Sequence, residues 1–256
     1  MARQTPEFEL RLARDAADIR AGQRLRYSVF VEEMGGDGPL VDHEARLERD
    51  ALDDRADHLL LFDKAAPGGP AVGAYRLLRG DMLGPGELFY SDGEYDLSAL
   101  TGSGRRLLEL GRSCVHRDYR GGPALMRLWQ GLLAYVERHR IEVMFGVASF
   151  HGTDLAPIAP VLSLLHHRHL APPELRLRAI GDNARSMDLI PEAEIDRPAA
   201  MRDVPVLIKA YLRLGGFVGE GAWIDRDFNT TDIGIVVDIA RVPARMRARY
   251  AGGLRG

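Results

Sequence analysis

The stretch Leu107-Leu108-Glu109-Leu110-Gly111-Arg112-Ser113-Cys114-Val115 decides the fold of this chain. Its apolar residues predict a β-strand, yet a carboxylate and a guanidinium interrupt them. A charged side chain that faces a core costs several kcal/mol unless it is paired. We therefore expect these two charges to be exposed, paired or retained for chemistry.

The spacing of Glu109 and Arg112 predicts a local irregularity. Residues three apart in a regular strand point to opposite faces. Gly111 lies between them and permits a β-bulge, which would turn both side chains to one cleft and free backbone N–H groups for a carbonyl oxygen. The alternative is a Glu–Arg pair on an exposed strand face. If both charges serve one site, the strand must break register near Gly111.

Composition limits the class of protein. The 256 residues suffice for one large domain or two small ones, and 46% of them are hydrophobic. No apolar run reaches the ~18 residues of a membrane span, and the N-terminus lacks the apolar core of a signal peptide. The single cysteine, Cys114, fits a reducing compartment and reads as a buried, inert thiol. We expect a cytoplasmic protein, and the net charge of −3 gives no case for nucleic-acid binding.

The order of elements predicts an α/β (α+β) fold. Apolar periodicity and turn residues indicate one domain over residues 1–256, with core motifs in 16–150 and a C-terminal half, 151–256, that completes the sheet and the pocket. Residues 35–56 read as a polar loop and 174–190 as extended chain. Helices are expected over 16–34, 123–139, 154–170 and 204–214, and strands over 58–63, 71–78, 107–115, 143–150, 217–224 and 233–239.

Three further patterns carry weaker chemical signals. Arg120-Gly121-Gly122-Pro123 precedes a helix, whose N-terminus attracts anions, although it also fits an ordinary loop. The acids Asp53, Asp54 and Asp57 would suit a cationic amine or a solvated loop. No metal site is expected, since the histidines at 166, 167 and 169 lack a recognised ligand spacing.

The C-terminal end is rich in arginine. Arg241, Arg245, Arg247, Arg249 and Arg255 face few acids in this stretch. They indicate either a solvated helix end or a surface that contacts an anionic membrane.

Taken in order, these motifs resemble a known superfamily. Arg26 with Val29-Phe30, the acids Asp54 and Asp57, Arg76-Leu77-Leu78 and Glu109-Leu110-Gly111-Arg112 resemble acyl-homoserine-lactone synthases. The chain is more similar to the ornithine N-acyltransferases, hemolysin-like acyltransferases of the GNAT superfamily. That likeness adds Tyr119-Arg120, Leu128-Trp129, Tyr211–Gly215 and the segment Asp225–Asp232.

The resemblance implies a GNAT-type fold: a mixed, mostly antiparallel sheet flanked by helices, with a C-terminal extension and a splayed strand pair for a thioester arm. The implied reaction moves a 3-hydroxyacyl chain from acyl carrier protein to the α-amino group of ornithine, giving lyso-ornithine lipid, with the acyl-phosphopantetheine donor and no other cofactor. The usual loop, Gln/Arg-x-x-Gly-x-Gly/Ala, is altered at Arg120–Ala124, which disfavours coenzyme A.

The resemblance also implies roles for single residues. Glu109 would be the base, directly or through water, beside Arg112 and Ser113 at an oxyanion-holding bulge. Arg26 or Arg112 would bind the acceptor's carboxylate, and Asp54 and Asp57 its side-chain ammonium. The expected substrate-binding residues are Arg26, Phe30, Asp54, Asp57, Arg76, Phe89, Asn229 and Asp232. The expected donor-arm residues are Val115, Arg120, Gly121, Gly122 and Trp129.

Three alternatives remain open at this point. A homoserine-lactone synthase would share the first four motifs but would use S-adenosylmethionine. A coenzyme A-dependent N-acetyltransferase would need the usual glycine loop. A catalytically inactive acyltransferase fold would serve as a partner-binding module. The predicted partners are acyl carrier protein, an amino-acid acceptor and the inner face of the membrane.

Overall fold

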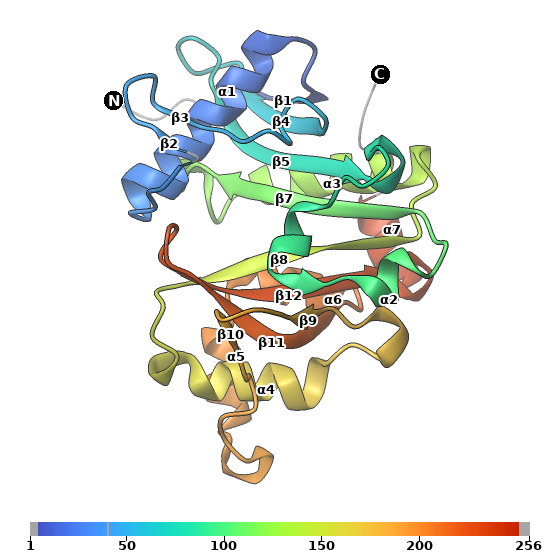
Figure 1. The fold of residues 1–256 in the computed structure, drawn as a ribbon. Coiled ribbons are helices and arrows are strands. Elements are labelled where there is room, and N and C mark those ends of the chain that lie inside the picture. The colour runs from blue at the N-terminus through green and yellow to red at the C-terminus, as the bar shows by residue number, and fades with distance from the viewer. Residues whose placement is uncertain (1–4, 40, 251–256) are drawn as a thin grey trace.

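Twelve strands and seven α-helices are assigned in the computed structural model, which describes residues 5–39 and 41–250 (Figure 1). The strands are β1 Phe8–Leu12, β2 Val41–Asp42, β3 Leu47–Glu48, β4 Asp57–Asp63, β5 Ala71–Arg79, β6 Tyr95–Asp96, β7 Leu107–Val115, β8 Val143–His151, β9 Arg178–Ala179, β10 Ala184–Arg185, β11 Phe217–Asp225 and β12 Thr230–Asp238. The helices are α1 Ala16–Arg26, α2 Ser98–Thr101, α3 Ala124–Arg138, α4 Ala159–His169, α5 Arg197–Asp203, α6 Val206–Arg213 and α7 Ala244–Tyr250.

One mixed sheet organises these elements. Its order is β1-β4-β5-β7-β8-β12-β11-β9-β6, with β10 paired to β11, while β2 and β3 form a separate hairpin. The pairs β7–β8 and β9–β11 are parallel, and the other pairs are antiparallel. The predicted mixed, mostly antiparallel sheet flanked by helices is therefore confirmed.

The long predicted elements are confirmed, with some shifted ends. The six predicted strands correspond to β4, β5, β7, β8, β11 and β12, and the helix expected over 16–34 is α1 followed by a π-helical segment, Tyr27–Glu33. β1, the β2–β3 hairpin and the short strands β6, β9 and β10 were not predicted. Two or five residues give too little alternation to distinguish a strand from a loop.

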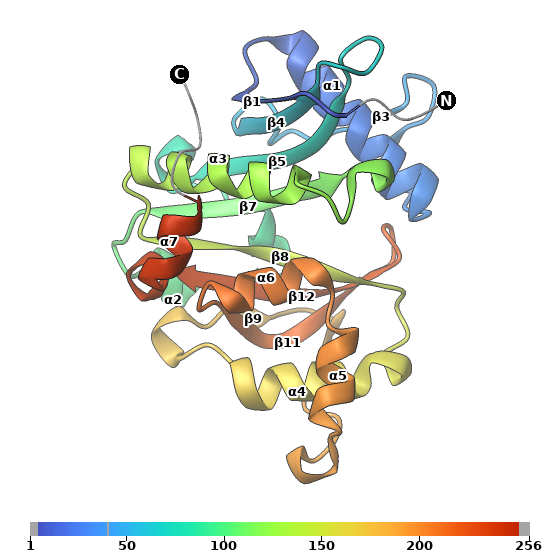
Figure 2. The ribbon, with the colours of Figure 1, turned by 180° about the vertical axis from the view of Figure 1, so that it is seen from behind.

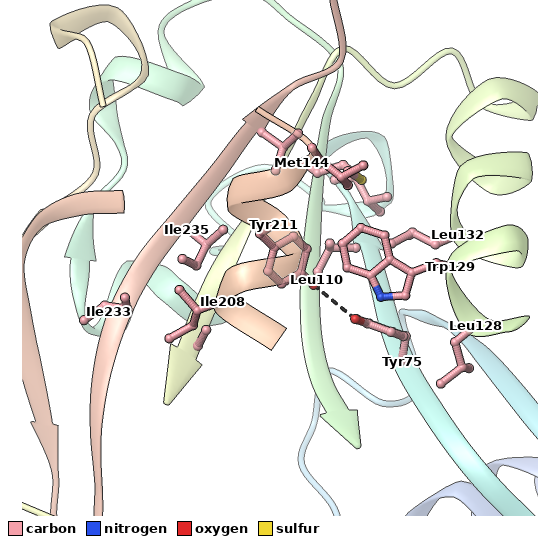
Figure 3. Packing of buried hydrophobic residues seen from close by; sticks show 14 of the residues in the cluster. Tyr75, Leu110, Leu128, Trp129, Leu132, Met144, Ile208, Tyr211, Ile233 and Ile235 are labelled. Carbon is pink, nitrogen blue, oxygen red and sulfur yellow. Dashed lines mark hydrogen bonds between the residues drawn. The ribbon is translucent and has the colours of Figure 1, made fainter. Parts of the chain in front are cut away.

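Two layers cover the sheet. Figure 2 shows α3, α6 and α7 over one face, where α3 and α6 contribute to the largest apolar core. In Figure 3, Trp129 of α3 and Tyr211 of α6 lie beside Tyr75 of β5, whose hydroxyl is 3.2 Å from that of Tyr211. The opposite face is covered by α1 and by residues 89–96, the crossing segment, which runs from β7 toward β11 and β12.

Strands β7 and β8 form a fork. They pair in parallel at Leu107, Leu108 and Glu109 only, and Figure 1 shows them moving apart beyond that point. Each then continues with its other neighbour, β7 with β5 and β8 with β12. Beyond Glu109 and Phe145, the facing edges of β7 and β8 are not paired with each other.

A β-bulge interrupts β7 within this fork. Arg76 of β5 pairs with Gly111 and Ala74 pairs with Cys114, so the single residue Tyr75 faces both Arg112 and Ser113. Arg112 has a φ of 50°, in the left-handed region that residues other than glycine rarely adopt. The predicted register break near Gly111 is confirmed.

Candidate active site

The bulge turns Glu109 and Arg112 to the same face of the sheet. Cys114 follows them onto this face and packs against α1, whereas Leu110 and Val115 face the α3 side. Ser113 also lies on the α3 side, where it interacts with the buried Tyr75 hydroxyl. The three residues predicted to be catalytic, Glu109, Arg112 and Ser113, are therefore close together in the chain but lie on two faces of the sheet.

A buried network of charges, called here the ionic layer, lies beneath α1. Arg26 donates to both carboxylate oxygens of Asp53, at 2.8 and 2.6 Å, and its Nε lies 2.5 Å from Glu48. Arg112 joins Glu48 at 3.0 Å and Asp50 at 3.1 Å. The ionic layer comprises three guanidinium groups and three carboxylates: Arg26, Arg76 and Arg112, with Glu48, Asp50 and Asp53.

The charges of the ionic layer stabilise one another. Burial favours the neutral form of Asp53, but hydrogen bonds and charge from Arg26 outweigh it and hold the Asp53 pKa far below its usual value. Burial likewise opposes the charge of Arg112, yet Glu48 and neighbouring groups raise the Arg112 pKa. Removing one member of such a buried pair typically costs about 3–5 kcal/mol.

Glu109 holds the crossing segment against the sheet. Its two carboxylate oxygens accept the backbone N–H groups of Tyr90 and Ser91, at 2.9 and 2.7 Å. Arg112 lies over the Tyr90 ring, 4.6 Å from its centroid. Burial raises the pKa of Glu109, and each carboxylate oxygen retains a second lone pair for a further hydrogen bond.

Three buried carboxylates meet at the far side of the crossing segment. This acidic cluster consists of Glu94, Asp225 and Asp232, whose carboxylate oxygens lie within 4.8 Å of one another. Burial, and then the charge of Asp232, raises the pKa of Glu94 well above its usual value. Burial raises the pKa of Asp232 to about 6, although Ser149 and Thr230 oppose the shift.

Of the acidic trio Asp53, Asp54 and Asp57, only Asp53 belongs to the ionic layer. Asp54 is exposed, and Asp57 accepts from Arg79 and from Tyr135, away from the arginines of the layer. Asp50 and Asp53, rather than Asp54 and Asp57, pair with the arginines of the ionic layer. The cause is local: residues 51–55 form a turn, so only Asp53 of the sequence trio points inward.

The other predicted acceptor residues differ in their surroundings. Arg26 and Arg76 belong to the ionic layer, and Asp232 belongs to the acidic cluster. Phe30 is half-buried and packs edge-on against Phe228 of the β11–β12 turn. Phe89 packs against Phe145 in the core, and Asn229 is exposed in the β11–β12 turn with a φ of 51°; neither side chain reaches the ionic layer.

The predicted donor-arm residues lie on or near the α3 side. Trp129 is buried in the main core, and Val115 packs against that core. Arg120 donates to both oxygens of Glu33 and to the carbonyl of Val115, so its guanidinium is already engaged. Gly121 and Gly122 are exposed just before α3, whose N-cap, Pro123, supplies no side-chain hydrogen bond.

Several residues of the site were not predicted. Glu48 and Asp50 lie in the segment interpreted as a loop, and Glu94 lies in an unassigned stretch. One signal was available: Glu94 is followed by the aromatic Tyr95 and the apolar Leu97, which are buried, and an acid beside buried apolar residues is a candidate for a site. His167 lies 3.2 Å from the Asp188 carboxylate, a pairing that spacing along the chain did not reveal.

The sheet, the fork and the bulge define an acyltransferase of the GNAT type. Residues 25–130 match the model of the acetyltransferase (GNAT) domain. The chain belongs to the family of L-ornithine N(alpha)-acyltransferases: it is 55% identical to the protein of that name from Rhodobacter capsulatus, over 100% of this chain and 99% of the relative. The chain is therefore an acyltransferase, as predicted.

Solved structures support the fold. FeeM, an N-acyl amino acid synthase from uncultured soil microbes, aligns over 92% of this chain and 93% of its own, with a TM-score of 0.54 and 14% identity. The acyl-homoserine-lactone (AHL) synthase LasI aligns over 98% of both chains, with a TM-score of 0.53 and 14% identity. The predicted kinship of fold with such synthases is confirmed.

Proposed function

We propose that this enzyme transfers a 3-hydroxyacyl chain from acyl carrier protein to the α-amino group of ornithine, giving lyso-ornithine lipid. The name of the Rhodobacter capsulatus relative supports the acceptor. The observation that carries the proposal is the bulge at Arg112 and Ser113, where an apolar face and a charged face of the sheet meet at an open fork. An acyl thioester and an amino acid need those two environments side by side.

The α3 side of the fork suits the donor. The residues around the fork there are largely apolar: Leu110, Met144, Phe145, Gly146, Val147, Tyr211, Ile235 and Val237. The first-turn amides of α3 and the dipole of this 15-residue helix favour an anion beside Gly121 and Gly122. The guanidinium of Arg120 is already hydrogen-bonded to Glu33. We therefore assign the single phosphate of a carrier-protein arm to the first-turn amides of α3.

The charged face suits the acceptor. Arg26 is bonded to Glu48 and Asp53, which leaves the other arginines of the ionic layer for the amino acid's carboxylate. Arg76 is the better placed, because its buried Nη2 has no hydrogen-bond partner among the described residues. A guanidinium binds a carboxylate through two parallel hydrogen bonds.

The chemistry needs a neutral amine. Glu109, whose pKa is raised by burial, accepts the proton from the α-ammonium through a water. The amine nitrogen then bonds to the thioester carbon, and backbone N–H groups at Arg112 and Ser113 hold the oxyanion. Collapse of the intermediate breaks the carbon–sulfur bond, the thiolate leaves and takes up the proton that the attacking nitrogen gives up, and an amide remains.

The test is direct. The purified chain is incubated with 3-hydroxyacyl carrier protein and a pool of amino acids, and the products are identified by mass spectrometry, with the matching acyl-coenzyme A in a parallel reaction. We expect N-acyl ornithine from the carrier-protein thioester. An acyl lactone, acylation of another amino acid in preference to ornithine, or no product would overturn the proposal.

We place the enzyme in the cytoplasm, in contact with the inner face of the membrane that its lipid product enters. No helix within the described residues is long and apolar enough to cross a bilayer. Arg241 pairs with Glu174 and Asp238, Arg245 is exposed on α7, and Arg255 lies outside the described residues. If a chain lacking residues 244–256 sediments with anionic vesicles as the full chain does, these arginines make no membrane contact.

A further inference from the structure

The acidic cluster differs from the ionic layer in its balance of charge. Every carboxylate of the ionic layer forms an ion pair with a guanidinium, whereas Glu94, Asp225 and Asp232 form none with a cation of the described chain. Two of their oxygens, Oε2 of Glu94 and Oδ1 of Asp232, are buried and accept no hydrogen bond from a described residue. Such groups are costly unless a ligand completes them.

The position of the acidic cluster connects it to the reaction site. Asp232 of β12 pairs in register with Ser149 of β8, the strand that forms one arm of the fork. Tyr90 links the two sites: its backbone N–H is held by Glu109, its ring lies under Arg112, and its side chain interacts with Glu94. The acidic cluster therefore lies on the acceptor face, along the crossing segment from Glu109.

We propose that Glu94, Asp225 and Asp232 bind the side-chain ammonium of the acceptor and so restrict the enzyme to a diamino acid. This proposal rests on the proposed function and specifies its substrate class. The α-amino group lies at Glu109 and the fork, while the side chain extends past Tyr90 into the acidic cluster. An ammonium group has three N–H donors, and two of them would pair with the two unpartnered oxygens of Glu94 and Asp232.

This assignment replaces Asp54 and Asp57 as the ammonium site. Asp57 is already bonded to Arg79 and Tyr135, and Asp54 is exposed, so neither offers a desolvated acceptor. A buried, unpaired carboxylate discriminates more strongly, because an acceptor without a cation leaves it uncompensated.

The experiment compares L-ornithine with L-norvaline, which has the same carbon chain without the terminal amine. We expect the wild-type protein to favour ornithine in kcat/KM. Asp232→Asn and Glu94→Gln should each lower kcat/KM for ornithine about 100-fold, the loss that follows removal of one partner of a buried charge pair. Their kcat/KM for norvaline should stay within about twofold of wild type, which reports intact chemistry.

Asp238→Asn is the matched control. Asp238 lies on the same strand and the same face as Asp232, but it pairs with Arg105 and lies beside Val143, where β7 and β8 have not yet separated. The control should keep the wild-type preference for ornithine. Circular dichroism of each variant verifies the fold, and Glu94→Gln provides the measurement if Asp232→Asn does not fold.

The outcomes separate the two proposals. Acylation of ornithine with an unchanged ornithine-to-norvaline ratio in both variants would overturn the ammonium site and leave the proposed function standing. If no amino acid is acylated, calorimetric titration with ornithine and norvaline still tests the site, and equal binding of both would overturn it. Activation by Mg²⁺ that EDTA and Asp232→Asn both abolish would identify a divalent cation instead.

Discussion

The carbonyl oxygen of Leu110 occupies the place where a side chain of Gly146 would begin. A Cβ built on Gly146 would lie well under 3.0 Å from this oxygen, closer than real Cβ atoms come. The two residues follow the last parallel pair of the fork, Glu109 with Phe145. Glycine at this point lets β7 and β8 approach closely before they separate.

Gly146→Ala should open the fork and impair transfer. The added methyl meets backbone rather than a flexible side chain, so we expect a loss of about 1–3 kcal/mol in the free energy of unfolding and a larger relative loss of acyl transfer. Chemical denaturation and product formation measure the two effects. Gly93→Ala is the control, since nothing lies within 4 Å of its Cβ position; unaltered transfer by Gly146→Ala would refute this account of the fork.

Asp53→Asn should destabilise the fold severely. It leaves Arg26 buried without the carboxylate that accepts two of its hydrogen bonds, and we expect a cost of about 3–5 kcal/mol in urea unfolding. Asp42→Asn removes the partner of Arg49 on the surface and should cost at most about 1 kcal/mol. Equal losses in the free energy of unfolding in the two variants would show that the ionic layer stabilises the fold no more than a surface ion pair does.

Glu109→Gln should lower activity and stability together. A glutamine side chain has one acceptor oxygen and one NH₂ group, so it cannot accept both the Tyr90 and the Ser91 N–H groups. We expect a loss of about 1–3 kcal/mol from the unpaired backbone group, with a reduced rate of acylation. A variant with wild-type stability and no activity would confine Glu109 to proton transfer; a variant with wild-type activity would exclude it as the base.

Asp232→Asn should make the empty protein more stable at neutral pH. The pKa of Asp232 is about 6 in the folded state, above its usual value, so the folded state holds its proton more tightly than the unfolded state. The stability that this tighter proton binding contributes is fully present below about pH 4 and is lost as the pH rises through 6. We expect the variant to gain about 2–3 kcal/mol over wild type above pH 7 and almost nothing at pH 4, and a gain that shrinks as pH rises would contradict the assignment.

The preference for ornithine should increase with pH. An ammonium binds the ionised form of the acidic cluster, and burial raises the pKa of both Glu94 and Asp232. Besides each other, these two acids interact with the charged and titratable groups of Asp225, Arg112, Tyr90 and Tyr95. The ratio of kcat/KM for ornithine to that for norvaline should rise between pH 5 and 7 in the wild-type protein and rise less in Asp232→Asn, where only Glu94 of the two acids still titrates.

Sequence patterns predicted the framework better than the site. Strands β4 and β8 and helix α3 are long and strongly apolar, so their periodicity identifies them, and the spacing of Glu109 and Arg112 required a bulge that the structure contains. Partners in the ionic layer lie far apart in the chain: Glu48 and Arg112 are 64 residues apart. Neighbouring acids such as Asp53 and Asp54 differ only in which way a turn points them, and no local pattern reveals that direction.

Because of its bulge, β7 is more sensitive to a change in its number of residues than to a change in which residues it contains. Loss of one residue at Arg112 or Ser113 would remove the bulge and let β7 pair regularly with β5, and Cys114 and Val115 would keep their present faces. The change would fall on Arg112, which would be lost or turned toward α3, away from Glu109 and the ionic layer. Neighbouring side chains can accommodate a substitution in this strand, but they cannot restore a bulge that a one-residue deletion removes. We therefore expect natural variants to keep the number of residues in β7 even where the residue types differ.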